Sequence, residues 1–234
     1  MRPRTFLAGL AFSALLLATI AFAQGDQPGA GTTVTSGVAN WDSALPVEAI
    51  VSTLLEELGY DVPDARAVAP PIGFQGIIQG DLDYWPNTWW PQQVTLVPDD
   101  FEDHASNVAT LIERGAIQGY MASKDAVDEY GIESLADFAR PEVREAFDPD
   151  GNGTVEMLGC IPGWACSDII RHHLEANDLQ DVINVQEVDY AAGFADVLAR
   201  YRDGEPVLYY AWTPNFTHTR LVPGEDVMLS LIHI

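Results

Sequence analysis

Apolar and polar residues alternate along the chain with two periods, one typical of helices and the other of strands. Between Val47 and Leu58, six apolar residues fall on one helical face, which predicts an amphipathic helix that ends at Gly59. The other elements predicted here are strands over 31–38, 60–62 and 82–85 and a short helix over 74–79, after a break at Pro70-Pro71. This β-α-β order favours an α/β fold with a largely parallel sheet.

The second half of the chain continues the same alternation. The elements predicted there are strands over 116–121, 155–158 and 207–211 and helices over 123–130, 134–138, 141–147, 167–177 and 189–202. Without a 23-residue leader, 234 − 23 = 211 residues remain. That length is enough for one large core or two small ones.

The first 23 residues have the pattern of a cleavable secretory signal. Arg2 and Arg4 give the positive start, an apolar run follows over 6–20, and 21–23 is a small-residue cleavage site. No cysteine stands directly after that site, so we expect no lipid anchor. No later apolar run approaches the roughly 20 residues of a membrane span. We therefore expect export to the periplasm, where a disulfide can persist.

Acidic residues strongly outnumber basic ones, and the formal net charge is −24. Because the leader carries two arginines and no acidic residue, the rest of the chain carries −24 − 2 = −26. Lys124 is the only lysine. This charge argues against nucleic acid and anionic membranes as partners. It fits a protein that faces high salt equally well as one that needs only solubility, so it identifies no function.

The only two cysteines, Cys160 and Cys166, enclose a Pro-Gly turn and Trp164. With two cysteines only one intramolecular pair can form, and it would fix this loop at a strand-to-helix junction. The loop then presents an aromatic face beside the backbone N–H groups of Ala165 and Cys166. These groups stand at the start of a helix, where the dipole favours an anion.

Tryptophans are the other unusual feature of the sequence. Trp85, Trp89 and Trp90 lie within six residues of a loop that contains two prolines, and Trp212 follows a buried strand. Proline excludes a regular helix or a central strand here. Three large rings on one loop are difficult to bury together, so we expect at least one of Trp85, Trp89 and Trp90 to face a ligand, with core packing as the alternative; Trp212 could likewise cap the core. Indole faces attract cations, and quaternary ammonium groups in particular. Such rings and N–H groups together suit a small ligand that carries both a cation and an anion.

Other signals point to structure rather than chemistry. His172 and His173 are adjacent in a predicted helix, so they point about 100° apart and cannot chelate one ion together. Residues 148–152 resemble the start of an EF-hand calcium loop, but Gly159 stands where the closing glutamate belongs, and an Asx turn is the alternative. The sequence has no nucleophile elbow, phosphate-binding glycine loop or metal motif, so we predict no enzyme, no cofactor and no metal site.

The motifs together resemble the glycine betaine/proline betaine substrate-binding proteins of osmoprotectant ABC importers. The resemblance covers about residues 31–228, and its most specific part is Gly-Cys-x-Pro-Gly-Trp-x-Cys at 159–166. The supporting motifs are Leu-Gly-Tyr at 58–60, Gln-Gly-Tyr at 118–120, Asp-Tyr-Ala-Ala at 189–192 and Tyr-Tyr-Ala-Trp-Thr-Pro at 209–214. The resemblance implies a two-lobe α/β fold of the type II-like periplasmic binding proteins, which closes on its ligand like a hinge.

The resemblance also implies a domain organisation. Residues 24–117 are expected to form the N-terminal part of a first lobe and residues 118–225 a second lobe. Residues 226–234 are expected to begin a return to the first lobe. Because family members continue for many tens of residues, we expect a C-terminally truncated chain with an incomplete first lobe. The protein is expected to be a monomer.

A set of ligand-binding residues follows from the resemblance in the same way. They are Trp89, Trp164 and Trp212 for an aromatic box, with Trp85 and Trp90 as substitutes for Trp89, and Ala165, Cys166 and Gln93 for the ligand's carboxylate. The family pattern has a histidine where this chain has Gln93. An amide can donate a hydrogen bond but brings no charge, which leaves choline or another betaine open as the ligand.

The expected function is therefore that of a non-enzymatic binding protein that delivers a betaine-type osmolyte to a membrane permease. A carbohydrate-binding module is the alternative, since tryptophan platforms also stack on sugars. That alternative requires many side-chain donors and acceptors beside the rings, and the loops around Trp89 and Trp164 offer few. An enzyme acting on a quaternary amine is a third class, which no base, metal or cofactor motif supports.

Overall fold

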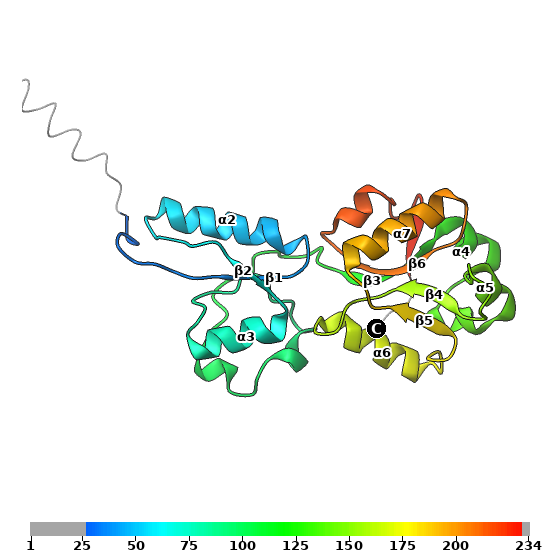
Figure 1. The fold of residues 1–234 in the computed structure, drawn as a ribbon, viewed down its shortest axis with the longest axis horizontal. Coiled ribbons are helices and arrows are strands. Elements are labelled where there is room, and N and C mark those ends of the chain that lie inside the picture. The colour runs from blue at the N-terminus through cyan, green and yellow to red at the C-terminus, as the bar shows by residue number, and fades with distance from the viewer. Residues whose placement is uncertain (1–26, 231–234) are drawn as a thin grey trace, which may run out of the picture.

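A computed structural model describes residues 27–230, which form two lobes joined end to end (Figure 1). The expected leader and its cleavage site, like residues 231–234, lie outside the described residues. One lobe contains a two-stranded sheet and the other a five-stranded sheet. We call residues 27–117 the first lobe and residues 118–230 the second lobe. The mixture of sheets and helices confirms the α/β prediction.

The first lobe is built on a short parallel sheet. Its elements in chain order are β1 (Gly37–Ala39), α2 (Ala44–Glu57), β2 (Arg66–Val68) and α3 (Pro70–Gln79), followed by 3-10 turns at Val94–Leu96 and Phe101–Asp103. β1 and β2 pair in parallel with Val38 opposite Ala67. A parallel pair needs a crossover connection, and α2 provides it.

Two predictions for the first lobe are wrong in detail. Pro70 and Pro71 begin α3 rather than precede it, because proline at the first helical positions lacks only an N–H that the helix does not use. The segments predicted as strands around residues 61 and 84 make isolated bridges, Thr33 with Asp61 and Ser36 with Tyr84.

The second lobe holds the larger sheet. Its elements in chain order are β3 (Gln118–Ser123), α4 (Lys124–Tyr130), α5 (Pro141–Ala146), β4 (Val155–Leu158), α6 (Ala165–Ala176), β5 (Ile183–Gln186), α7 (Tyr190–Arg202), β6 (Leu208–Trp212) and β7 (Val227–Ser230), with 3-10 turns at Leu135–Ala139 and Phe216–Thr219. The strand order is β5-β4-β6-β3-β7. β4 is parallel to both β5 and β6, and β3 is antiparallel to β6 and β7.

The connections of the parallel strands create a natural binding position. From β4 the chain moves outward through α6 to β5, and it then returns through α7 to β6 on the other side of β4. Because such crossovers are right-handed, α6 and α7 cover opposite faces of the sheet, as Figure 1 shows. The carboxyl ends of β4 and β6 thus lie side by side where the winding reverses. Open α/β sheets bind ligands at such a point.

The segment expected to begin a return to the first lobe contains β7. This strand pairs with β3 in the second-lobe sheet, with Leu229 opposite Met121. Through residue 230 the chain is therefore an edge strand of the second lobe. Within the same described residues, no helix combines the length and the apolar composition needed to cross a bilayer.

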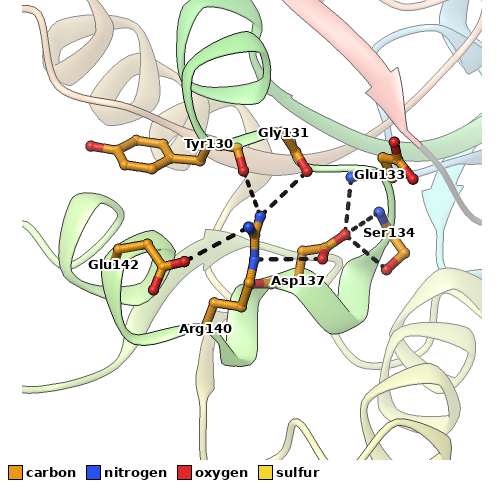
Figure 2. Close-up of polar contacts among 7 residues, drawn as sticks. All are labelled: Tyr130, Gly131, Glu133, Ser134, Asp137, Arg140 and Glu142. Carbon is orange, nitrogen blue, oxygen red and sulfur yellow. Dashed lines mark hydrogen bonds and ion pairs between the residues drawn. The ribbon is translucent and has the colours of Figure 1, made fainter.

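Arg140 connects the helices at the outer end of the second lobe (Figure 2). Its guanidinium donates to the carbonyl oxygens of Tyr130 at 2.7 Å and Gly131 at 3.4 Å, where α4 ends and leaves carbonyls without helical partners. It also lies 3.5 Å from the carboxylate of Asp137 and 3.7 Å from that of Glu142. These contacts hold the α4–α5 connection in place.

Candidate ligand-binding site

The disulfide between Cys160 and Cys166 is confirmed. It closes the loop that follows β4, and α6 begins inside this loop, at Ala165. Trp164 occupies the N-cap position with an extended backbone, and no side chain caps the helix. The N–H groups of Ala165 and Cys166 belong to the first turn, where a helix supplies no carbonyl partner. They are therefore available as donors to a ligand.

A pocket opens at the carboxyl ends of β4 and β6, against the first lobe. It is lined by Trp41, Trp89, Gln92, Gln93, Gln118, Trp164, Ala165, Cys166 and Trp212. The space between these residues is about 360 Å³, part of it in the open mouth. Six of the eight residues named from the sequence line this one pocket, and the two substitutes for Trp89 do not.

Indole rings form most of the pocket wall. Trp164 and Trp212 meet edge to face with ring centroids 5.7 Å apart, and Trp41 meets Trp164 in the same way at 5.3 Å. Trp89 packs against the second-lobe core from the first lobe. Trp41 lies in the loop between β1 and α2, and the sequence analysis did not assign it to the site. The pocket therefore has four indoles, two from each lobe.

Trp85 is the assigned residue that does not line the pocket. Its ring lies 6.2 Å from that of Phe74 and fills the space over Gly37 and Gly73, where a Cβ atom would come within 2.9 Å and 2.4 Å of it. Trp85 thus packs in the first lobe beneath α3, so we leave it out of the proposed site. Trp90, the other substitute considered, is 45% exposed and also lies outside the pocket lining.

Three glutamines supply the side-chain polar groups of the pocket. Gln93 is buried, and its Oε1 accepts a hydrogen bond from the backbone N–H of Trp89 at 3.1 Å. Gln118 accepts one from the hydroxyl of Tyr210 at 3.0 Å. Both carbonyl oxygens are therefore engaged by the protein, which leaves the amino groups to donate to a ligand. Gln92 completes the set and, like Gln118, was missed from the sequence.

Tyr190 supports the indoles from behind. Its ring lies 4.8 Å from Trp212 and 6.1 Å from Trp164, and its hydroxyl donates to the carbonyl oxygen of Tyr210 at 2.6 Å. Burial, with a smaller contribution from Tyr209, raises the pKa of Tyr190 well above its usual value. The phenol therefore stays neutral, and no side chain that lines the pocket carries a charge.

The histidines and the calcium-like loop lie elsewhere. His173 Nδ1 is 3.0 Å from the hydroxyl of Tyr120. In the calcium-like loop, Asp150 accepts a hydrogen bond from the backbone N–H of Asn152 at 3.3 Å, and Asn152 accepts one from that of Thr154 at 2.8 Å, as in Asx-type turns. Across residues 27–230, no group of three or more His, Cys, Asp and Glu side chains is arranged to hold a metal ion.

Comparison with known proteins agrees with this geometry. Residues 32–226 match the model of the substrate-binding domain of ABC-type glycine betaine transport systems. The chain belongs to this family. The family's description is that of a binding domain and not of an enzyme, in agreement with the sequence prediction.

Members of this family in two enteric bacteria are similar over most of the chain. The glycine betaine/proline betaine-binding periplasmic proteins of Salmonella typhimurium and Escherichia coli are each 34% identical, over 96% and 92% of this chain. The matches cover 67% and 65% of those proteins, so the chain spans about two thirds of their length.

A solved structure of the family shows the same fold. The crystal structure of lactococcal OpuAC, in its closed-liganded conformation complexed with glycine betaine, matches with a TM-score of 0.68 at 16% identity. The match covers 86% of this chain and 70% of that chain. The prediction of a two-lobe periplasmic binding protein fold is therefore confirmed.

Proposed function

We propose that this chain is the substrate-binding component of an ABC importer and captures a small quaternary-ammonium zwitterion of the glycine betaine or proline betaine type. The indole faces of Trp41, Trp89, Trp164 and Trp212 receive the cation. A quaternary ammonium has no N–H to donate, so aromatic faces are its natural partners. The N–H groups of Ala165 and Cys166 receive the carboxylate, with the dipole of α6 in the favourable sense.

The observation that carries this proposal is the imbalance between donors and acceptors in the pocket. The side-chain oxygens of two of the three lining glutamines, Gln93 and Gln118, already accept hydrogen bonds from Trp89 and Tyr210, whereas the backbone N–H groups of Ala165 and Cys166 are available as donors. A sugar hydroxyl needs acceptors as well as donors, whereas a carboxylate needs donors only. The pocket therefore favours a carboxylate-bearing cation over a carbohydrate, although both stack on tryptophan.

We also propose where the protein acts and which protein receives its ligand. The similar proteins in enteric bacteria are named as periplasmic, and the chain begins with a leader-like segment. We therefore place the protein in the periplasm as a monomer that hands its ligand to the membrane permease of the importer. The pocket offers a betaine indole walls and backbone N–H groups, and no side chain that lines it carries a charge.

Calorimetric titration with glycine betaine, proline betaine, choline and a panel of sugars tests the proposal. We expect binding of the two betaines and weaker binding of choline, which has no carboxylate for the α6 amides. Binding of a sugar with no betaine binding would overturn the proposal. Absence of binding by all three quaternary amines would do the same.

A pair of neighbouring tryptophans provides a matched test of the box. Trp89→Leu removes a pocket indole but keeps an apolar side chain, and the loss of one desolvated cation–π contact should weaken betaine binding about 5- to 30-fold. Trp90→Leu changes the adjacent, exposed indole outside the pocket and should leave affinity unchanged. Equal effects of the two substitutions would remove Trp89 from the site.

A further inference from the structure

Asn40 and Ser43, at the two ends of the loop between β1 and α2 (residues 40–43), contact two pocket indoles through the indole nitrogens. Trp164 Nε1 donates to Asn40 Oδ1 at 2.8 Å, and Trp212 Nε1 donates to Ser43 Oγ at 2.9 Å. Both donors belong to the second lobe and both acceptors to the first. The two hydrogen bonds therefore cross the boundary between the lobes at the edge of the pocket.

The Ser43 hydroxyl makes the interlobe contact in place of a helix-capping hydrogen bond. It occupies the N-cap position of α2, where a serine hydroxyl normally accepts from the first turn of its own helix. Here the side chain makes no capping hydrogen bond and accepts from Trp212 instead. By contrast, the buried Nε1 of Trp41 in the same loop has no hydrogen-bond partner, so packing alone holds that ring.

We propose that Asn40 and Ser43 are positioning residues that hold the lobes closed by accepting hydrogen bonds from the pocket's own tryptophans. An indole binds a cation with its face, and its N–H lies in the ring plane. The same two rings can therefore serve the ligand and the interlobe contact without competition. Separating the lobes breaks both hydrogen bonds, so the contacts stabilise the closed state and slow ligand release. Of the two tests below, only the kinetic test with glycine betaine rests on the proposed function.

Stopped-flow kinetics with glycine betaine gives the first test. Removing one acceptor, as in Asn40→Ala or Ser43→Ala, should increase the dissociation rate about 2- to 10-fold with little change in the association rate, as expected for one lost hydrogen bond. Ser43→Thr keeps the hydroxyl and should restore slow release. Thr53→Ala serves as the matched control, because its hydroxyl bonds to Ala49 within α2. A loss that Ser43→Thr does not restore would overturn the proposal.

A ligand-free measurement separates this proposal from the proposed function. Both native cysteines are in the disulfide, so cysteines introduced by Glu57→Cys on α2 and Glu175→Cys on α6 can be spin-labelled selectively. In the Asn40→Ala/Ser43→Ala background we expect the interlobe distance distribution to shift to longer values than in the otherwise unchanged protein. Identical distributions would overturn the proposal. A clear shift in a protein that does not bind glycine betaine would support the interlobe contact and reject only the ligand assignment.

Discussion

The side-chain oxygen of Gln93 accepts a hydrogen bond from the backbone N–H of Trp89, 3.1 Å away and four residues earlier in the chain. This hydrogen bond holds the loop that carries the Trp89 indole. Because the Gln93 oxygen is engaged, the Gln93 amino group remains as the donor to a ligand. Gln93 is only 3% exposed, so this geometry has little freedom to change.

Gln93→Glu should separate betaine from choline. The carboxylate keeps the oxygen that Trp89 needs, but it removes the donor and places a negative charge near the ligand's carboxylate. We expect the Kd of glycine betaine to rise more than about tenfold, since hydrogen bonds to charged groups contribute about 1.5–3 kcal/mol. Choline has no carboxylate and should lose much less. Calorimetry with both ligands measures the difference, and equal losses would contradict the assigned role of Gln93.

Ligand affinity should be nearly independent of pH. No residue that lines the pocket titrates in the neutral range, and Cys166 is in the disulfide. Burial raises the pKa of Tyr190, which packs behind Trp164 and Trp212, so this phenol stays neutral in moderately alkaline solution. We expect the Kd of glycine betaine to change less than about twofold between about pH 6 and 9. A steep change in calorimetric affinity in this range would reveal an ionisable group in contact with the ligand.

Folding stability, in contrast, should depend on His173. Burial, together with repulsion from His172, lowers the pKa of His173 below its usual value. As pH falls through the unfolded pKa of about 6.5, the unfolded chain binds a proton that the folded protein does not, so the free energy of unfolding decreases. His173→Gln keeps an acceptor for the Tyr120 hydroxyl and cannot titrate. Urea unfolding at pH 7.5 and 5.5 should therefore show a smaller acid-induced loss in this variant.

The matched control for that experiment is the neighbouring histidine. His172 is exposed on the same helix, one residue before His173. His172→Gln should keep most of the wild-type dependence on pH. If both variants lose the dependence equally, His173 is not its source.

Removing the disulfide should affect stability and binding together. For a loop this short, the Cys160→Ala/Cys166→Ala variant should lose about 2 kcal/mol of unfolding free energy, the expected entropy of loop closure. Because the loop also carries Trp164 and the donors of α6, betaine affinity should fall as well. Urea unfolding and calorimetry on the same samples measure both effects, with wild type plus reductant as a parallel. Unchanged affinity would show that packing alone holds the loop.

The second-lobe part of the site could be predicted because its signals are local. The motif around Cys160 and Cys166 contains a strand end, a turn and a helix start within eight residues, and Trp212 stands directly after an apolar run. These features fix where the side chains lie along the chain. The sheet order then brings the ends of β4 and β6 together, as an α/β pattern leads one to expect.

The first-lobe contribution was harder to predict because it depends on how the lobes meet. Trp41 stands just after the end of β1, and Trp212 is the last residue of β6, so a tryptophan at a strand end was the available signal for both. Trp85 and Trp89 are nearly indistinguishable in sequence, yet the space above Gly37 and Gly73 takes Trp85 into the first lobe. Gln118 lies in a strand that was predicted from the apolar residues around it, and nothing in that pattern marked Gln118 as a pocket residue. Contacts between residues far apart in the chain do not produce a periodic pattern in the sequence.

Trp164 and Trp212 are 4% and 7% exposed and belong to the same packed cluster as the second-lobe core, whereas Trp41 and Trp89 are only partly buried. Replacing a buried indole creates a cavity that costs several kcal/mol of stability, regardless of its effect on ligand. Substitutions of Trp41 or Trp89 leave the larger core intact, so we expect changes of ligand preference to be tolerated better at these positions. Divergence among relatives should concentrate on the positions of Trp41 and Trp89, while the second-lobe wall persists.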